Sequence, residues 1–198
     1  MRILIAFVSL SQLAAQQESV ALEPPYGPAN RLVSPDGIYA LFGIAPTAEL
    51  WLENQRTHER KMVFNVTVQT LTLAWSPDSS AFIANDREAS DLERTYIYDV
   101  RTLDRLDLRS RILASDPKAH PFVPNENTAP HSYCHATRWL DPKHVEVRLH
   151  GHTDGERIGN TFRPVQCFDL RYNIGKDGVV RKLSERVAPV ASAGCASE

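Results

Sequence analysis

The chain has 198 residues, of which 42% are hydrophobic and 23% are charged, with 13 Pro and 9 Gly. These proportions are those of an ordinary globular protein, and they exclude a disordered chain, a collagen-like repeat and a disulfide-stapled miniprotein. The 24 acidic and 22 basic side chains give a net charge of −2, so no overall positive field favours nucleic acid or an anionic membrane. We therefore expect a single domain and no nucleic-acid partner.

The first fifteen residues have the pattern of a secretory signal peptide. Arg2 precedes the apolar run 3–10, and small residues follow before a polar stretch begins at Gln16. The run is too short for a transmembrane helix, which needs roughly 20 residues. It is also good strand material, but no turn-forming residue separates it from the first methionine. We expect cleavage after Ala15, with Ala21 as the alternative, and an exported protein, periplasmic or extracellular, that has no transmembrane anchor in its mature form.

An internal repeat follows the signal segment. The turn sequence Ser34-Pro35-Asp36-Gly37 recurs as Ser76-Pro77-Asp78-Ser79, which is 42 residues later. A weaker third copy has Asp141-Pro142 after Trp139, and its offset of 64 residues from Trp75 requires an insertion. The stretch 113–135 contains several Pro residues, so we predict that this insertion is a loop.

Each copy of the repeat predicts four short antiparallel strands in about 40 residues, which is the content of one β-propeller blade. In the third copy, residues 144–149 alternate between polar and apolar, as a half-buried strand does. No window predicts an amphipathic helix, and residues 87–94 are expected to form a loop. The predicted domain therefore spans 22–186, and residues 187–198 are expected to form a flexible tail.

Residues 74–78 (Ala-Trp-Ser-Pro-Asp), followed by 96–100 (Tyr-Ile-Tyr-Asp-Val), resemble the TolB-like and WD-type β-propeller repeats of secreted bacterial proteins. The resemblance covers 31–186. It implies an all-β, propeller-like stack of about three four-stranded antiparallel blades, used for binding or as a scaffold. Such families close a ring with roughly four to eight blades. Three units imply an open, partial propeller, a ring completed by association, or a further blade hidden in the insertion.

The sequence contains none of the common catalytic or cofactor motifs. A Gly-x-Ser-x-Gly elbow, a phosphate-binding Gly loop, a His-Glu-x-x-His motif and a Cys-x-x-Cys pair are all missing from it. The recurring acids Glu53, Asp99 and Asp169 are expected to end strands and to accept hydrogen bonds from turn amides. We therefore predict no catalytic residues and no resident cofactor.

Histidine is the one compositional anomaly, because six of the seven lie between positions 120 and 152. Neutral imidazole is a good ligand for zinc or copper, so this region is a candidate metal site. The alternative is that these histidines are polar residues of surface loops and bind no metal. The residues proposed as ligands are His131, His135, His150, His152 and Asp154.

The three cysteines leave the disulfide pairing open. Export to an oxidising compartment favours one bridge and one odd thiol. A Cys134–Cys167 bridge is favoured, through adjustment of the loop, although a whole strand is expected between these two residues. The alternatives are a bridge from Cys195, folded back from the tail, or three reduced thiols.

These observations favour an exported, non-enzymatic module that binds a protein or a cell-envelope component. The edges of an incomplete stack would also permit self-association. One alternative is a metal-binding or metal-dependent protein that uses residues 120–154. Another is a hydrolase with a shallow site at the blade ends, in which His135 or His150 works with Asp154.

Overall fold

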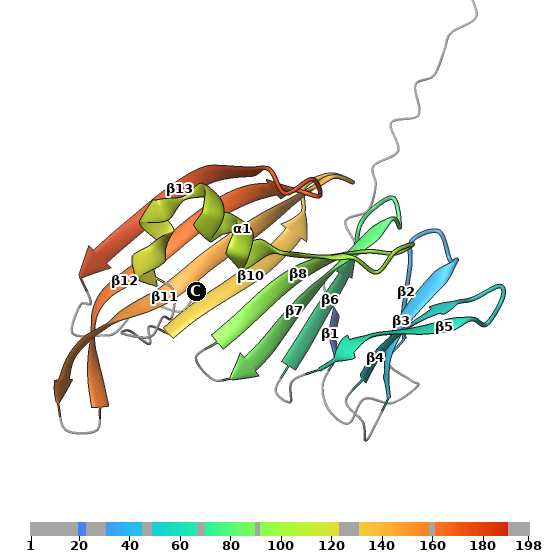
Figure 1. Cartoon of the computed structure of the whole chain (residues 1–198), viewed down its shortest axis with the longest axis horizontal. Coiled ribbons are helices and arrows are strands. Elements are labelled where there is room, and N and C mark those ends of the chain that lie inside the picture. The colour runs from blue at the N-terminus through green and yellow to red at the C-terminus, as the bar shows by residue number, and fades with distance from the viewer. Residues whose placement is uncertain are drawn as a thin grey trace, which may run out of the picture.

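The computed structural model describes residues 20–22, 31–44, 49–66, 70–89, 92–122, 131–158 and 161–189. The described chain is mostly β-strand, in two sheets, with a short helical segment lying on one face of the larger sheet (Figure 1). The expected all-β fold is confirmed. In chain order the elements are β1 (Val20–Leu22), β2 (Arg31–Val33), β3 (Tyr39–Ile44), β4 (Glu49–Asn54), β5 (Arg60–Asn65), β6 (Thr70–Trp75), β7 (Ala81–Ala89), β8 (Leu92–Asp99), β9 (Arg105–Asp107), α1 (Leu108–Ser115), the 3-10 helix η1 (Pro117–Phe122), β10 (His131–Trp139), β11 (His144–Ile158), β12 (Thr161–Gly175) and β13 (Val180–Pro189).

The smaller sheet contains β2, β3, β4 and β5 in chain order, each antiparallel to the next. Its inner face places Leu41 and Leu50 in a core shared with β6, β7 and β8. On its outer face the Glu53 carboxylate, only 5% exposed, accepts hydrogen bonds at 2.7 Å from both Arg31 and Arg60. The bond from Arg31 is the largest cause of the lowered pKa of Glu53. On this outer face the buried carboxylate of Glu53 is therefore neutralised by two arginines.

The larger sheet joins the second repeat unit (β6–β9) to the third (β10–β13). The last strand of the second unit, β9, pairs with β8 only at Tyr96–Tyr98. At the start of β8, Leu92 and Glu93 pair instead with Ser132 and Tyr133 of β10, in parallel. The result is a nine-stranded sheet of order β1-β6-β7-β8-β10-β11-β12-β13, with β9 beside β8, rather than two separate four-stranded sheets. Within the described ranges, neither sheet closes into a ring.

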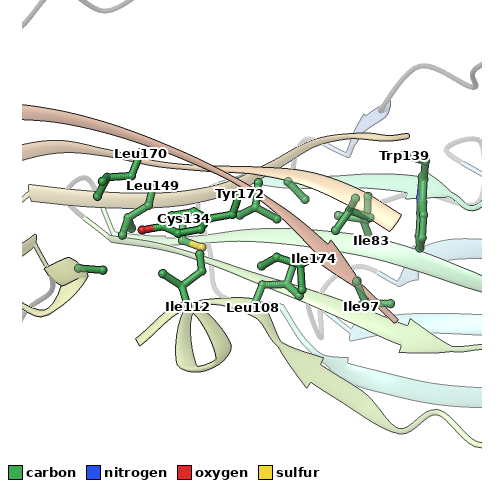
Figure 2. Packing of buried hydrophobic residues seen from close by; sticks show 14 of the residues in the cluster. Ile83, Ile97, Leu108, Ile112, Cys134, Trp139, Leu149, Leu170, Tyr172 and Ile174 are labelled. Atoms are coloured by element: carbon green, nitrogen blue, oxygen red, sulfur yellow. The ribbon is translucent and has the colours of Figure 1, made fainter. Parts of the chain in front are cut away.

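The helix α1 begins at the residue directly after β9, the fourth strand of the second unit. Its N-cap Asp107 accepts a hydrogen bond from the Ser110 amide at 3.0 Å, as an N-cap residue does. Leu108 and Ile112, one helical turn apart, are fully buried. Figure 2 shows both side chains directed toward Cys134 and the strands behind it. The expectation of no helix was wrong, because eight residues with two core positions make too short a pattern to detect.

The predicted loop insertion at 113–135 also has regular structure at both ends. The end of α1 and η1 occupy its first part, and β10 begins at His131, inside the predicted loop. Residues 123–130 lie outside the described residues. The window 87–94, predicted as a loop, is mostly strand, since β7 continues to Ala89 and β8 begins at Leu92.

The two Ser-Pro-Asp turns have the same hydrogen bonds. Ser34 and Ser76 each donate a hydroxyl hydrogen bond at 2.6 Å to the aspartate two residues later. Their amides each bond to a carbonyl five residues later at 2.8 Å. Gly37 and Ser79 occupy the same position with φ of 70° and 59°. In the third turn Leu140 takes the place of the serine, and Asp141 accepts bonds from the amides of Lys143 and of His144, the first residue of β11, at 2.6 and 2.9 Å.

In the second and third units, a tryptophan connects the unit to the one before it. Trp75 donates its indole hydrogen bond to the Leu32 carbonyl at 3.0 Å, and Trp139 donates to the Ala74 carbonyl at 3.2 Å. Both acceptors lie two residues before the Ser-Pro turn of the preceding unit. Both indoles are almost completely buried. The tryptophans therefore occupy equivalent places in the two contacts between consecutive units.

The sheet extends beyond both predicted domain limits. At its start, β1 pairs antiparallel with β6, from Val20 opposite Leu73 to Leu22 opposite Leu71. At its end, β13 continues to Pro189, so the first residues of the predicted tail are strand. The signal segment 1–19 and residues 190–198 lie outside the described residues. None of the described helices has the length and hydrophobicity to cross a membrane.

Candidate binding surface

The sheet formed by β10–β13 has one apolar face and one polar face. Strand alternation places Cys134, Val147 and Leu170 in the core beneath α1, and the residues between them on the opposite side. We call this opposite side the open face. None of its side chains is fully buried. It comprises His131, Tyr133, His135 and Arg138 of β10, Glu146, Arg148, His150 and His152 of β11, Cys167, Asp169, Arg171 and Asn173 of β12, and Arg181, Ser184 and Arg186 of β13.

The clustered histidines lie on this face in two neighbouring strands. His131 is opposite His152, and their rings stack at 4.4 Å. His150 is opposite Tyr133, with ring centroids 5.4 Å apart. His131 and His135 fall within the predicted loop 113–135, but all five proposed metal ligands belong to strands β10 and β11. The side chain of one of them, Asp154, lies outside the described part.

His135 is held by a carboxylate from the neighbouring strand. Its Nδ1 lies 2.8 Å from Glu93, and its Nε2 is 3.5 Å from the Asn85 amide nitrogen. His150 is half-buried, and burial together with the nearby Arg148 guanidinium lowers its pKa. The imidazole of His150 is therefore expected to be neutral at pH 7.

The described residues do not assemble a metal centre. Among them, no group of three or more His, Cys, Asp or Glu side chains is arranged to hold an ion. The proposed zinc or copper site stays a prediction, since one of its ligands, Asp154, has no described side chain. What the structure brings together instead is one histidine–histidine pair, one histidine–tyrosine pair and one histidine–carboxylate pair.

Both acids on the open face are paired with arginines. Asp169 accepts two hydrogen bonds from Arg148, at 2.9 and 3.1 Å, and Glu146 accepts one from Arg138 at 2.9 Å. Burial opposes ionisation of Asp169, but the bonds from Arg148 hold its pKa below the usual value. Asp169 was expected to satisfy turn amides, and so was Glu53, but both pair with arginines. Only Asp99 has the expected role, accepting from two turn amides at 2.8 and 3.0 Å.

Three exposed arginines on the open face are held less closely by acids than Arg138 and Arg148 are. Arg171 is 46% exposed and approaches Asp169 and Glu146 only to 3.8 Å. Arg181 and Arg186, both exposed, form no ion pair with any described residue. Sequence reasoning did not identify this arginine triad, which we define as Arg171, Arg181 and Arg186.

The triad gathers around Ser184. Ser184 is opposite Arg171, while Arg186 and Arg181 are opposite the residues two before and two after Arg171 on β12. Diagonal neighbours of this kind lie about 7–8 Å apart in an antiparallel pair. Simple alternation would put Arg181 and Arg186 on opposite faces. A register shift that leaves Leu183 as an extra residue turns both onto the open face.

The favoured Cys134–Cys167 disulfide was wrong. Cys134 is a free, buried thiol, whereas Cys167 is disulfide-bonded. Cys134 faces the core beneath α1, and Cys167 faces the opposite side of the sheet with β11 between them. Burial raises the pKa of Cys134 to about 12. The remaining cysteine of the sequence, Cys195, lies outside the described residues.

A shallow hollow of about 330 Å³ lies on the other face, between the end of α1 and β12–β13. Asp116 accepts a hydrogen bond from the Tyr172 hydroxyl at 3.0 Å and pairs with Lys182 at 2.7 Å. Lys182 also pairs with Glu185. Because these polar groups satisfy one another, the hollow is best explained as a junction between helix and sheet.

No family model matches the sequence, and no curated protein matches it. Among solved structures, the chain is similar to an acylaminoacyl peptidase from Pyrococcus horikoshii, with 13% sequence identity and a TM-score of 0.31. The similarity covers 77% of this chain and 31% of the peptidase chain, so this chain spans less than a third of that protein's length.

Proposed function

We propose that the chain is an exported, non-enzymatic binding module, built as a propeller-like stack of three TolB-like or WD-type units. The equivalent indole bonds of Trp75 and Trp139 support the stack, as do the matching turns at Ser34 and Ser76. The partner is a protein or a cell-envelope component that docks on the open face.

The observation that carries this proposal is the contrast between the two faces of β10–β13. One face is buried beneath α1, and the other presents arginines and histidines with no side chain fully buried. An end unit with a polar outer face is what a stack of repeats requires for solubility, and such a face is also available to a partner.

The hydrolase alternative gains no support from the described contacts. The His135 ring contacts the Glu93 carboxylate and the Asn85 amide, neither of which is a hydroxyl or thiol nucleophile. The Cys134 thiol faces the opposite side of the sheet and is buried.

Site-specific photo-crosslinking tests the proposal. A benzophenone amino acid placed at Arg138, on the open face, is expected to capture one partner from the envelope or extracellular fraction of the source cells. The same group at Arg56, in an exposed turn of the smaller sheet, is the matched control. Equal capture from both positions, or no capture from Arg138 and His131, would contradict the proposal.

A further inference from the structure

We propose that the open edge of β13 and the arginine triad bind an extended polypeptide segment in which acidic and apolar side chains alternate. The inference rests on the proposed function and names the partner of the same surface. Three features of the last strand carry it: an edge with no neighbouring described strand, two exposed arginines (Arg181 and Arg186) that form no ion pair with a described residue, and exposed apolar side chains.

The edge is the first feature. β13 is ten residues long and pairs with β12 on one side only, so it ends the larger sheet among the described strands. A strand edge presents unpaired amide and carbonyl groups that a second extended chain can bond. The other end of the same sheet is the three-residue β1, which offers a much shorter edge.

The charge pattern on this edge sets the chemistry of the partner. A strand added beside β13 would place alternate side chains on the open face, next to Arg181, Ser184 and Arg186. Carboxylates suit these positions, because the guanidinium group matches a carboxylate in two parallel hydrogen bonds. The acids already on the face, Asp169 and Glu146, pair with Arg148, Arg138 and Arg171, and neither forms an ion pair with Arg181 or Arg186.

The opposite side chains of the added strand would meet a partly apolar surface. Val187, which is opposite the core residue Phe168, lies on this side and is 38% exposed, and Leu183, the extra residue at the register shift of β13, is 50% exposed. Apolar side chains of the partner would cover them. The open face itself exposes no large apolar side chain, so insertion into a lipid surface is disfavoured.

A second copy of β13 is a poorer occupant than an acidic strand. The strand carries Arg181, Lys182 and Arg186 against the single acid Glu185, so pairing two copies would oppose like charges. The same charges protect the edge against self-association while leaving it attractive to an acidic segment.

The test measures fluorescence anisotropy of a short labelled peptide in which Val and Glu alternate, with the full, disulfide-intact chain. Binding is expected, and it should weaken as salt rises. The double variant Arg181→Glu/Arg186→Glu should weaken it at least about tenfold. The control Arg56→Glu/Arg101→Glu has the same charge change at exposed positions outside the open face and should leave binding within about twofold.

Two further probes separate strand addition from simple charge attraction. A peptide of the same composition with its Glu residues in one block, and an alternating peptide with N-methylated amides, should both bind poorly. Equal binding by either would overturn strand addition, and so would stronger binding to phosphatidylglycerol vesicles or concentration-dependent dimerisation of the chain alone. No binding by any peptide, with crosslinking at Arg138 intact, would overturn this inference and leave the proposed function standing.

Discussion

The two contacts between consecutive repeat units share an anchor but differ in everything around it. At the first interface, between β2–β5 and β6–β8, Trp75 packs edge-on against Phe82, which stacks on Tyr98. At the second interface, between β6–β8 and β10–β13, Trp139 belongs to a largely aliphatic core cluster that includes Ile83 (Figure 2). At the first interface the two units stay in separate sheets. At the second interface β8 and β10 pair at one end, so that the two units form one sheet.

The difference follows from the shortness of β9. Because β9 covers only three residues of β8, the backbone near Leu92 is left for β10 to pair with. Farther along, β10 leaves this ladder, and the Asn85 side chain bonds both the amide and the carbonyl of Ala136, at 2.9 and 3.1 Å. The Thr95 hydroxyl lies between Asn85 and the Cys134 carbonyl. The equivalent tryptophan bonds therefore set where consecutive units contact each other. The strands and side chains around each tryptophan determine whether the two sheets merge or stay separate.

The largest expected effects come from removing the anchors. Trp75→Ala and Trp139→Ala should each lower the free energy of unfolding by about 3–5 kcal/mol, because each leaves a large cavity and an unpaired carbonyl. Urea unfolding monitored by circular dichroism measures both. Trp75→Phe and Trp139→Phe, which keep most of the ring, are the controls. If Trp139→Ala lowered the free energy of unfolding no more than a surface substitution does, Trp75 and Trp139 would not be equivalent in the two interfaces.

The polar bridge at Asn85 is the next test, and it concerns the second interface alone. Asn85→Ala should cost about 1–3 kcal/mol, because the buried amide and carbonyl of Ala136 lose their partner. Amide hydrogen exchange should accelerate at Ala136 and not in β3 of the first sheet. Thr95→Val removes only the supporting hydroxyl and should cost less. Unchanged exchange at Ala136 in Asn85→Ala would contradict the assigned role of this side chain.

Cys134 reports on the apolar side of the second interface. Cys134→Ser should destabilise the fold by about 1–2 kcal/mol, because it buries a hydroxyl in an aliphatic core. With its pKa raised to about 12, the native thiol should resist alkylation at pH 7 and react only on unfolding. Mass spectrometry after iodoacetamide treatment in native buffer and in urea tests this. Rapid labelling of the native chain would contradict the buried position beneath α1.

The smallest effects are expected from the ties between turns. The Asp36 amide donates to the Ser79 hydroxyl at 3.0 Å at the first interface, and Lys176 pairs with Asp78 at 3.3 Å at the second. Ser79→Ala and Lys176→Met should each cost at most about 1 kcal/mol, since both ties are near the surface. Urea unfolding at pH 7 measures them, with Arg56→Met as the control.

The Lys176 tie should also depend on pH. Burial opposes ionisation of Asp78, but the hydroxyls of Ser76 and Ser80 and the charge of Lys176 lower its pKa to about 2. A carboxyl whose pKa is lowered on folding contributes stability above its ordinary pKa, near 4, and loses it as pH falls toward 2. Lys176→Met should therefore show a smaller loss of stability between pH 4 and pH 2 than the native chain. An identical loss would contradict the tie.

Sequence patterns predicted the strands and turns well where the signal is local. The Ser-Pro-Asp turns follow from residue chemistry, and the alternation in 144–149 shows which residues of β11 face the core. The same alternation in 169–173 could have shown that Asp169 and Arg171 share the polar face. The grouping of Arg181 with Arg186 could not be found this way, because it depends on the register shift at Leu183. The disulfide prediction failed because Cys134 faces the core, whereas Cys167 faces the other side of the sheet, two strands away.

The sequence by itself determined the all-β fold, the equivalent turns and the repeated position of Trp75 and Trp139, because turn chemistry and strand period act over a few residues. Only the tertiary structure decided that β10 pairs with β8, that α1 closes the core at the second interface, and that three arginines gather around Ser184. These features depend on which backbone edges and side-chain faces remain free once neighbouring strands have packed, and that is a property of the assembled sheet.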